Sequence, residues 1–271
     1  MKKRLLVIDV SNSFTKVGLA LGKRIIGVRR YPTKEICGKR LLADWPEAVW
    51  NEGVLSSVVP HVTRKLLAQL PDRILVVDAW NCGGLVVDYP EPKLIGADRL
   101  ANALACVRLY GPGSVVVDFG TAVTFDVINS SGAYVGGVIA PGLGMVAESL
   151  HSRTALLPKV HFKKPRRVVG RTTKDAMNAG AVFGYGGLVK EILGRIREEE
   201  FGGGVMRVVA TGGDARLVGS ISPVFDRIDP LLTLRGLAFA GYYLKESGGG
   251  ESEGMCATDS KKLSRGGRIE K

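Results

Sequence analysis

Cysteine and histidine are scarce in this chain of 271 residues, and neither is spaced to form a site. The four cysteines lie far apart, without the paired spacing of disulfide-linked or metal-binding cysteines, and only three histidines are present. We therefore expect neither a disulfide framework nor a zinc site, and any metal ion must be held by oxygen ligands. The residues concerned are Cys37, Cys82, Cys106, Cys256, His61, His151 and His161.

A long apolar run is also missing. No stretch reaches the roughly 18 residues that would span a bilayer. At the start, MKKRLLVIDV combines a basic patch with a short apolar run, but Asp9 ends that run before a signal-peptide core could form. We therefore expect a cytoplasmic protein that does not bind membranes.

Aromatic residues make up only 7% of the chain, and no nucleic-acid-binding module is recognisable. Positive charge is in excess, because 38 Lys and Arg against 26 Asp and Glu give a formal net charge of +12. The basic residues are spread along the chain, and such a field attracts an acidic small ligand as well as a nucleic acid. We expect a phosphorylated small molecule such as a nucleotide, and no nucleic acid.

The order of strand and helix patterns indicates an α/β fold. Short β-branched runs bounded by turn residues predict strands at residues 5–10, 114–118 and 206–210. Helical patterns fall near residues 97–110, 145–151, 173–197 and 231–245. From residue 247 onward the chain is rich in Gly and Ser and poor in large apolar side chains, so we expect a disordered tail over residues 247–271.

One strand pattern is repeated at an offset of 109 residues. Residues 5–21 and 114–130 each give an apolar strand, an Asp, a tight polar turn and a second strand, with Asp9 and Asp118 in matching places. Two ordinary hairpins with Asp-containing turns would give the same pattern, so the repeat alone does not decide for nucleotide binding. It does suggest a duplicated fold. The arrangement resembles the actin-like superfamily of sugar kinases and chaperone ATPases.

That resemblance implies two actin-like, ribonuclease H-like lobes whose duplicated strand-turn-strand phosphate hairpins surround a central cleft. We expect an N-terminal lobe over residues 1–112 and a C-terminal lobe over residues 113–246. In such hairpins small residues let backbone N–H groups approach phosphate oxygens, and the carboxylate at the strand end meets Mg²⁺ or its waters.

Eight motifs, including the turns of the two hairpins, follow one another along the chain in a specific order. Together they resemble the type III pantothenate kinases from end to end, except for the tail. The motifs are Asp9-Val-Ser-Asn12, Ser56-Ser-Val-Val-Pro60, Tyr89 before Gly96-Ala-Asp-Arg99, Asp118-Phe-Gly-Thr121, Gly136-Gly-Val-Ile-Ala-Pro-Gly-Leu143, Thr173 with Ala176 and Met177, Thr211-Gly-Gly213, and Leu232-Thr-Leu-Arg-Gly-Leu237.

The resemblance implies an ATP-dependent kinase that makes 4′-phosphopantothenate, the first step of coenzyme A biosynthesis. Asp98 is then the general base that takes the proton of the pantothenate hydroxyl as it attacks the γ-phosphate. Arg99 is a ligand to substrate oxygens, for which its planar charged fork is well suited. The implied pantothenate-binding residues are Tyr89, Gly96, Ala97, Asp98, Arg99 and Thr173.

Each of these residues also has a purely structural interpretation. Asp98 could stabilise the N-terminus of a helix, and Thr173 could cap the helix that follows it. Tyr89 stands directly before Pro90, where it could simply pack at the end of a strand. Without the wider match the structural interpretations of Asp98 and Tyr89 are favoured. For Thr173 the two roles are compatible, because a helix N-terminus attracts a carboxylate.

On the nucleotide side, the resemblance implies ATP with Mg²⁺ and a monovalent cation, K⁺ or NH₄⁺, held by Asp118. The Thr211-Gly212-Gly213 turn is expected to admit the adenosine moiety. The family is also expected to form homodimers with the substrate pocket near the subunit contact. The implied ATP-binding residues are Asp9, Val10, Ser11, Asn12, Ser13, Phe14, Thr15, Lys16 and Thr121.

The first hairpin departs from the family pattern D-x-G-N-T-N. Ser11 replaces a Gly and Phe14 replaces a polar residue, while Asn12 and Lys16 are retained. A Cβ at position 11 can obstruct the approach of the backbone to phosphate and disfavours positive φ. A second hypothesis is therefore a kinase homologue with a weakened nucleotide site that acts as a binding or regulatory protein.

Overall fold

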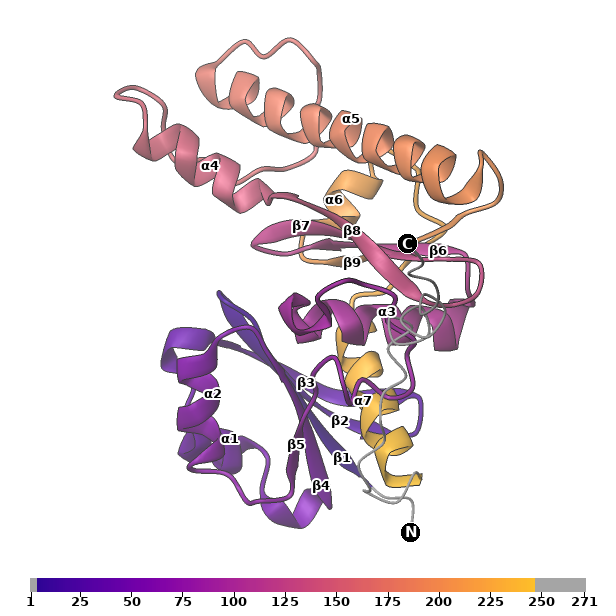
Figure 1. Ribbon diagram of the computed structural model, residues 1–271. Helices are drawn as coiled ribbons and strands as arrows, with labels where there is room; N and C mark the ends of the chain where they lie inside the picture. The colour runs from indigo at the N-terminus through magenta and orange to yellow at the C-terminus, as the bar shows by residue number, and fades with distance from the viewer. Residues whose placement is uncertain (1–3, 247–271) are drawn as a thin grey trace, which may run out of the picture.

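The computed structural model describes residues 4–246, so the expected disordered tail lies outside the described residues. Within them the chain forms two five-stranded sheets, which occupy the lower and upper halves of Figure 1. None of the helices between residues 4 and 246 has the length and apolar character needed to cross a bilayer.

The first sheet has the strand order β3-β2-β1-β4-β5. Its strands are β1 (Leu5–Val10), β2 (Phe14–Leu21), β3 (Arg24–Pro32), β4 (Glu52–Ser57) and β5 (Ile74–Val76). β1, β2 and β3 form an antiparallel meander, whereas β1, β4 and β5 run parallel. All six residues of β1 are buried, as expected for a central strand covered on both faces. The outer face is covered by α1 (Gly38–Asp44) and α2 (Pro60–Leu67).

The second sheet repeats this topology in the order β8-β7-β6-β9-β10. Its strands are β6 (Ser114–Phe119), β7 (Ala122–Ile128), β8 (Tyr134–Pro141), β9 (Arg207–Gly212) and β10 (Arg227–Ile228). Again the first three strands are antiparallel and the last two add in parallel. The duplication predicted from the repeat is therefore confirmed, and with it the two-lobed α/β fold.

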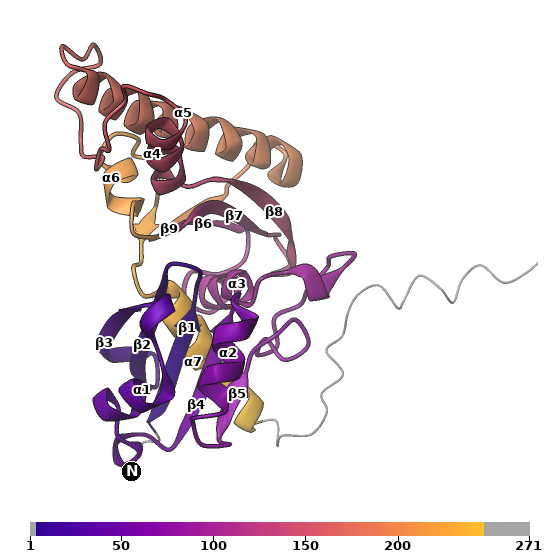
Figure 2. The same cartoon turned by 90° about the vertical axis from the view of Figure 1, so that its left-hand side faces the viewer.

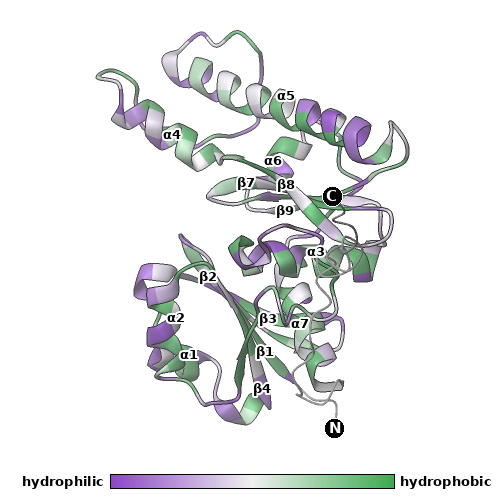
Figure 3. Ribbon diagram, in the orientation of Figure 1, coloured by the Kyte–Doolittle hydropathy of each residue, from purple (hydrophilic) through white to green (hydrophobic). Residues whose placement is uncertain are grey.

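Helices cover the outer face of the second sheet. These are α4 (Leu143–Ser152), the long α5 (Thr173–Phe201) and the short α6 (Ala215–Gly219). An apolar cluster of β6, β7, β9, α5 and α6 side chains lies beneath them. Figure 3 shows the central strands as hydrophobic and the exposed last turns of α5 as hydrophilic, which is the pattern of a helix lying on a surface.

Two helices separate the sheets. α3 (Ala97–Tyr110) contacts β6 and β7 of the second sheet, α7 (Leu232–Glu246) contacts β1 and β4 of the first, and α3 packs against α7 (Figures 1 and 2). The largest apolar cluster fills this middle layer. Residues 1–112 and 113–246 thus each contain one sheet, but each sends its last helix across to the other sheet. The two ranges remain a proposed division of the sequence, and packing interleaves them.

Candidate active site

The two repeated hairpins meet at the boundary between the sheets. Ser13, in the turn between β1 and β2, places its Oγ 3.0 Å from the Oγ1 of Thr121, in the turn between β6 and β7. The register within each hairpin shows how these two residues correspond. Asp9 pairs with Lys16 across the first hairpin and Asp118 with Thr124 across the second, so the first turn is one residue longer. Counted from the second strand of each hairpin, Ser13 and Thr121 are equivalent.

Asp9 stands near the end of β1 and is only 3% exposed. Its carboxylate accepts hydrogen bonds from Ser56 Oγ at 3.0 Å and from Ser11 Oγ at 3.3 Å. Burial, followed by the nearby charge of Asp98, raises the pKa of Asp9 to about 7. A buried carboxylate with so few donors suits a position where positive charge arrives with a ligand.

This environment makes the stability of the ligand-free protein depend on pH. Between about pH 4 and pH 7 folded Asp9 keeps a proton that the unfolded chain releases, because its pKa rises from 3.8 to about 7 on folding. Stability from this group is therefore lost as pH rises through that window. We expect the unfolding free energy of Asp9→Asn, relative to wild type, to increase by a few kcal/mol from pH 4 to pH 8, since one pKa unit is worth about 1.4 kcal/mol.

Urea unfolding with a metal chelator at several pH values measures this difference. Asp72→Asn, at an exposed position, gives the baseline for replacing a carboxylate by an amide. An Asp9→Asn difference that stays constant with pH would contradict the account.

Asp118 occupies the matching place on β6. Its Oδ2 accepts a hydrogen bond from the Asn102 amide at 2.9 Å, and Asn102 in turn accepts one from Thr233 Oγ1 at 2.8 Å. Burial raises the pKa of Asp118, while the ammonium of Lys16 acts in the opposite direction. Lys16 also lowers the pKa of Asp9, so one cation of the first hairpin acts on both aspartates.

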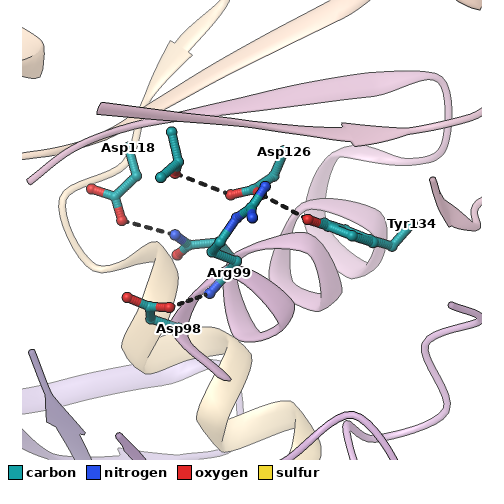
Figure 4. A network of polar contacts seen from close by, with 7 residues as sticks. Asp98, Arg99, Asp118, Asp126 and Tyr134 are labelled. Carbon is teal, nitrogen blue, oxygen red and sulfur yellow. Dashed lines mark hydrogen bonds and ion pairs between the residues drawn. The ribbon is translucent and has the colours of Figure 1, made fainter. Parts of the chain in front are cut away.

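Asp98 lies in the first turn of α3, where the middle layer reaches the hairpins. The helix cap is Gly96, and Asp98 Oδ1 accepts the backbone N–H of Arg99 at 2.8 Å (Figure 4). A Cβ at Gly96 would lie 2.6 Å from that oxygen, so glycine makes room for the carboxylate. Burial and the charge of Asp118 raise the pKa of Asp98. The structure therefore brings the acid at position 98 together with the aspartates of both hairpins.

Arg99 points away from the hairpins toward the second sheet. Its Nε donates to Asp126 Oδ1 at 2.6 Å, and Tyr134 donates its hydroxyl to the same oxygen at 3.2 Å (Figure 4). Tyr89 is partly buried and meets the ring of Tyr134 edge to face, with 6.3 Å between the centroids. Tyr89 and Arg99 thus both lie against the ring of Tyr134.

Thr173 is exposed and begins α5. The cap of this helix is Thr172, whose Oγ1 accepts the N–H of Asp175 at 3.1 Å, so the capping role considered for Thr173 falls to its neighbour. α5 covers the outer face of the second sheet, whereas α3, which carries Asp98 and Arg99, contacts β6 and β7 from the middle layer on the opposite face (Figure 1). The single chain therefore does not bring all the expected substrate residues together.

The equivalent turn of the second hairpin shows whether this position needs glycine. Gly120, which matches Ser11 in the repeat, does not have a positive φ, and a Cβ there would lie 3.4 Å from the nearest atom, an ordinary contact. The turn therefore does not require glycine. Phe14 is 37% exposed and carries the guanidinium of Arg30 above its ring, with Cζ 3.5 Å from the centroid.

Asn102, Asp126 and Tyr134 are polar residues of the site that motif reasoning missed. All three are buried, and each bonds to or touches a residue that the motifs did indicate. A signal was available for Asp126, because a charged residue interrupts the apolar β7 run. For Asn102 and Tyr134 the sequence offers only ordinary helix and strand positions.

Several relatives resemble this chain over most of its length. The family model described as type III pantothenate kinase matches residues 5–195. A type III pantothenate kinase of Akkermansia muciniphila is 45% identical over 236 residues, covering 87% of this chain and 97% of the relative. One of Methylacidiphilum infernorum is 41% identical over 248 residues, covering 89% of each.

Solved structures share the fold at much lower identity. A putative 2-dehydro-3-deoxygalactonokinase from Sinorhizobium meliloti gives a TM-score of 0.57 at 14% identity, covering 90% of this chain and 99% of that one. A putative Baf family transcriptional activator from Campylobacter jejuni gives 0.58 at 21% identity, covering 89% and 98%.

Duplicated five-stranded sheets joined by facing hairpins define the two-lobed actin-like fold. Within that class, the extent and identity of the sequence matches are decisive, and this chain belongs to the type III pantothenate kinase family. The resemblance of the eight motifs is thereby confirmed.

Proposed function

We propose that this protein transfers the γ-phosphate of ATP to the primary hydroxyl of pantothenate, giving 4′-phosphopantothenate for coenzyme A synthesis. The observation that carries the proposal is the meeting of three aspartates. The charge of Asp98 raises the pKa of Asp9, and the charge of Asp118 raises the pKa of Asp98, so the three carboxylates are close together. The hairpins that hold Asp9 and Asp118 touch through Ser13 and Thr121.

Asp98 is the proposed general base. Phosphoryl transfer asks mainly for positioning and charge stabilisation, with proton removal by a nearby carboxylate. Burial raises the pKa of Asp98, which makes its carboxylate a stronger base than an exposed aspartate. Arg99 and Tyr89 hold the substrate beside it. Arg99 binds the carboxylate of pantothenate, while the Tyr89 ring covers its apolar atoms.

ATP is proposed to lie between the hairpins, with Asp9 to Lys16 and Thr121 around its phosphates. Among residues 4–246 no group of three or more His, Cys, Asp or Glu side chains could hold a metal ion alone. This suits Mg²⁺ in a kinase, which is bound by one or two carboxylates together with substrate phosphates and water. Asp9 and Asp118 would hold it, and the ion would neutralise phosphate charge. Asp118 is also the proposed ligand of K⁺ or NH₄⁺.

The alternative, a homologue that only binds or regulates, is not favoured. Its motivation was the altered Ser11 to Phe14 turn, and the matching turn at Gly120 has room for a Cβ. The proposed base and substrate residues are all present, which a non-catalytic relative would not need.

Pantothenate-dependent formation of ADP, with the product identified by mass spectrometry, tests the proposal. We expect turnover with MgATP, a dependence on K⁺ or NH₄⁺, and a product heavier by one phosphate. No turnover at saturating ATP with Mg²⁺ and K⁺ would remove the kinase proposal and leave the binding protein.

Arg30 should contribute to ATP binding. One row of paired residues crosses the first sheet and ends at Arg30. Asp9 pairs with Ser56 on one side and with Lys16 on the other, and Lys16 pairs with Arg30. Directly paired residues point to the same face of a sheet, so the guanidinium stacked on Phe14 extends the row of charges outward. Arg30→Gln should raise the KM for ATP about 3- to 10-fold and leave the KM for pantothenate unchanged.

Arg24→Gln is the matched control, because Arg24 is also exposed on β3 but six residues away, about 20 Å along the strand. Steady-state kinetics at low and high salt measure both variants. The Arg30 effect should shrink with salt, since exposed charges are screened. Equal effects of the two variants would reduce Arg30 to a contribution of net charge.

A homodimer is also proposed. Large apolar side chains are exposed on β8, on α4 and in the segment before α5, and such side chains can be covered by a second chain. They are Ile139 (62% exposed), Met145 (46%), Leu156 (91%), Val168 (70%) and Val169 (77%). Pairing through this surface would give Thr173 a substrate to contact in a neighbouring chain. Light scattering tests the dimer, and Val169→Lys should favour the monomer.

A cytoplasmic location is proposed as well, since Cys37, Cys82 and Cys106 are unpaired.

A further inference from the structure

Asp126 is a buried carboxylate with three side-chain donors. It lies on β7 with 0% exposure and accepts from Arg99 Nε at 2.6 Å, Tyr134 hydroxyl at 3.2 Å and Thr124 Oγ1 at 3.3 Å (Figure 4). Its neighbours on the facing helix are the proposed base and substrate ligand of the site. The carboxylate itself does not reach solvent, so any function must act through these partners.

Arg99 is bound through its Nε, and among residues 4–246 its two Nη atoms form no hydrogen bond or ion pair, so both can donate to a ligand. A Cβ at Gly137 would lie 3.0 Å from one of these Nη atoms and would overlap the Phe125 carbonyl, so glycine lets the guanidinium lie close against β8. The guanidinium also lies 5.8 Å from the centroid of the Tyr134 ring. The Arg99 side chain is 16% exposed, so it is not sealed off from solvent. A fork held at one side in this way presents a defined pair of N–H groups to a carboxylate.

Tyr134 connects the same network to Tyr89. The backbone of Tyr134 accepts from Asp88 N at 2.8 Å and donates to Val86 O at 2.9 Å, so the segment leading to Tyr89 is aligned along the start of β8. The two rings meet edge to face, and a Cβ at Gly136 would lie 3.5 Å from the Tyr89 ring. One tyrosine therefore touches both proposed substrate ligands.

We infer that Asp126, together with Tyr134, is a positioning residue that aims Arg99 and Tyr89 at the carboxylate-bearing end of the acceptor substrate. This inference rests on the proposed function and adds the source of its selectivity. Because the second lobe supplies the platform and α3 supplies the arginine, recognition of a negatively charged acceptor depends on the packing of α3 against β7 and β8. A neutral acceptor of the same shape would gain no affinity from the positioned Arg99, because it has no carboxylate for the guanidinium to bind.

Asp126→Asn tests the inference through two acceptors, pantothenate and its neutral primary amide. The amide keeps the hydroxyl and the shape but lacks the charge. We expect Asp126→Asn to raise the KM for pantothenate about 10- to 100-fold, because Arg99 loses its charged partner, and to change the KM for the amide much less. The KM for ATP should stay within about twofold. Tyr134→Phe, which keeps the ring and loses one donor, should raise the pantothenate KM about threefold.

The chain offers a matched control at the other end of α3. Asp229 is also buried, at 5% exposure, and accepts from Arg235 Nη1 at 2.6 Å and from the Tyr110 hydroxyl at 3.0 Å. Tyr110 is eleven residues from Arg99, about 16 Å along the helix. Asp229→Asn should destabilise the fold as Asp126→Asn does but should leave the preference for pantothenate over its amide unchanged.

The outcomes separate the inference from the function. If wild type phosphorylates pantothenate but Asp126→Asn affects both acceptors equally, Asp126 is only a structural counter-ion and the inference fails. If wild type phosphorylates neither acceptor, the proposed function fails and the inference falls with it. Should Asp126→Asn not fold, Tyr134→Phe decides alone by the same ratio of the two acceptors.

Discussion

Replacing Asp98 with Asn should lower kcat for pantothenate phosphorylation by about 10²- to 10⁴-fold, the usual contribution of a positioned general base. The amide keeps the shape and can still accept the N–H of Arg99, but it cannot take the proton of the attacking hydroxyl. ATP binding should survive and become slightly tighter. The reason is electrostatic. Asp98 lies close enough to Asp9 to raise its pKa, and Asp118 raises the pKa of Asp98, so the three carboxylates repel one another's negative charge. Removing the charge of Asp98 leaves less negative charge near the triphosphate.

Single-turnover kinetics and calorimetric titration with ATP measure the two effects separately. Asp88→Asn serves as control, because Asp88 is an exposed carboxylate ten residues earlier in the chain. If the Asp98→Asn variant keeps the wild-type kcat, Asp98 has only the structural role of stabilising the N-terminus of α3. Joint loss of ATP binding and turnover would instead point to a damaged site.

Gly236→Ala should strongly destabilise the fold. A Cβ at this position of α7 would overlap the carbonyl oxygen of Ala101 on α3, and backbone atoms cannot move aside as a flexible side chain does. Overpacking in a core usually costs 1–3 kcal/mol and sometimes more. We expect about 3 kcal/mol or more here, or roughly 10 °C in Tm, because the two helices form the layer that joins both sheets.

Gly187→Ala is the matched control, since Gly187 also lies inside a helix but a Cβ there meets nothing within 4 Å. That variant should gain about 0.5–1 kcal/mol, because alanine loses less conformational freedom than glycine on folding. Differential scanning calorimetry compares the two. If Gly236→Ala melts at the wild-type temperature, the close approach of α3 and α7 is wrong. Failure to accumulate folded protein agrees with the expectation.

The hairpins were the part of the fold easiest to derive from the residues. The sequence contains an apolar strand, an Asp and a polar turn twice. The structure has a hairpin at each of these places, formed by β1 with β2 and by β6 with β7. Local chemistry suffices here because strand propensity and turn residues act over neighbouring positions. The proposed base could be indicated too, since Gly96-Ala-Asp-Arg99 opens a helix in both the sequence pattern and the structure.

Other parts of the site depend on contacts between distant residues. Asn102 meets Asp118 because α3 crosses to the second sheet, and Thr233 joins them because α7 returns beside α3. No periodicity or residue spacing in the sequence predicts that these helices cross between the sheets. The pairing of Asp126 with Arg99 is equally non-local, because the two residues are 27 positions apart on different elements.

By itself, then, the sequence determined the repeated units, the class of fold and the family, since these follow from short patterns whose order along the chain is their information. The tertiary structure alone decided which polar groups face one another at the lobe boundary and which are withdrawn from water. That difference has a physical reason. Burial and long-range pairing set the pKa of Asp9 and the aim of Arg99, and both arise only when two helices from opposite halves of the chain pack between the sheets.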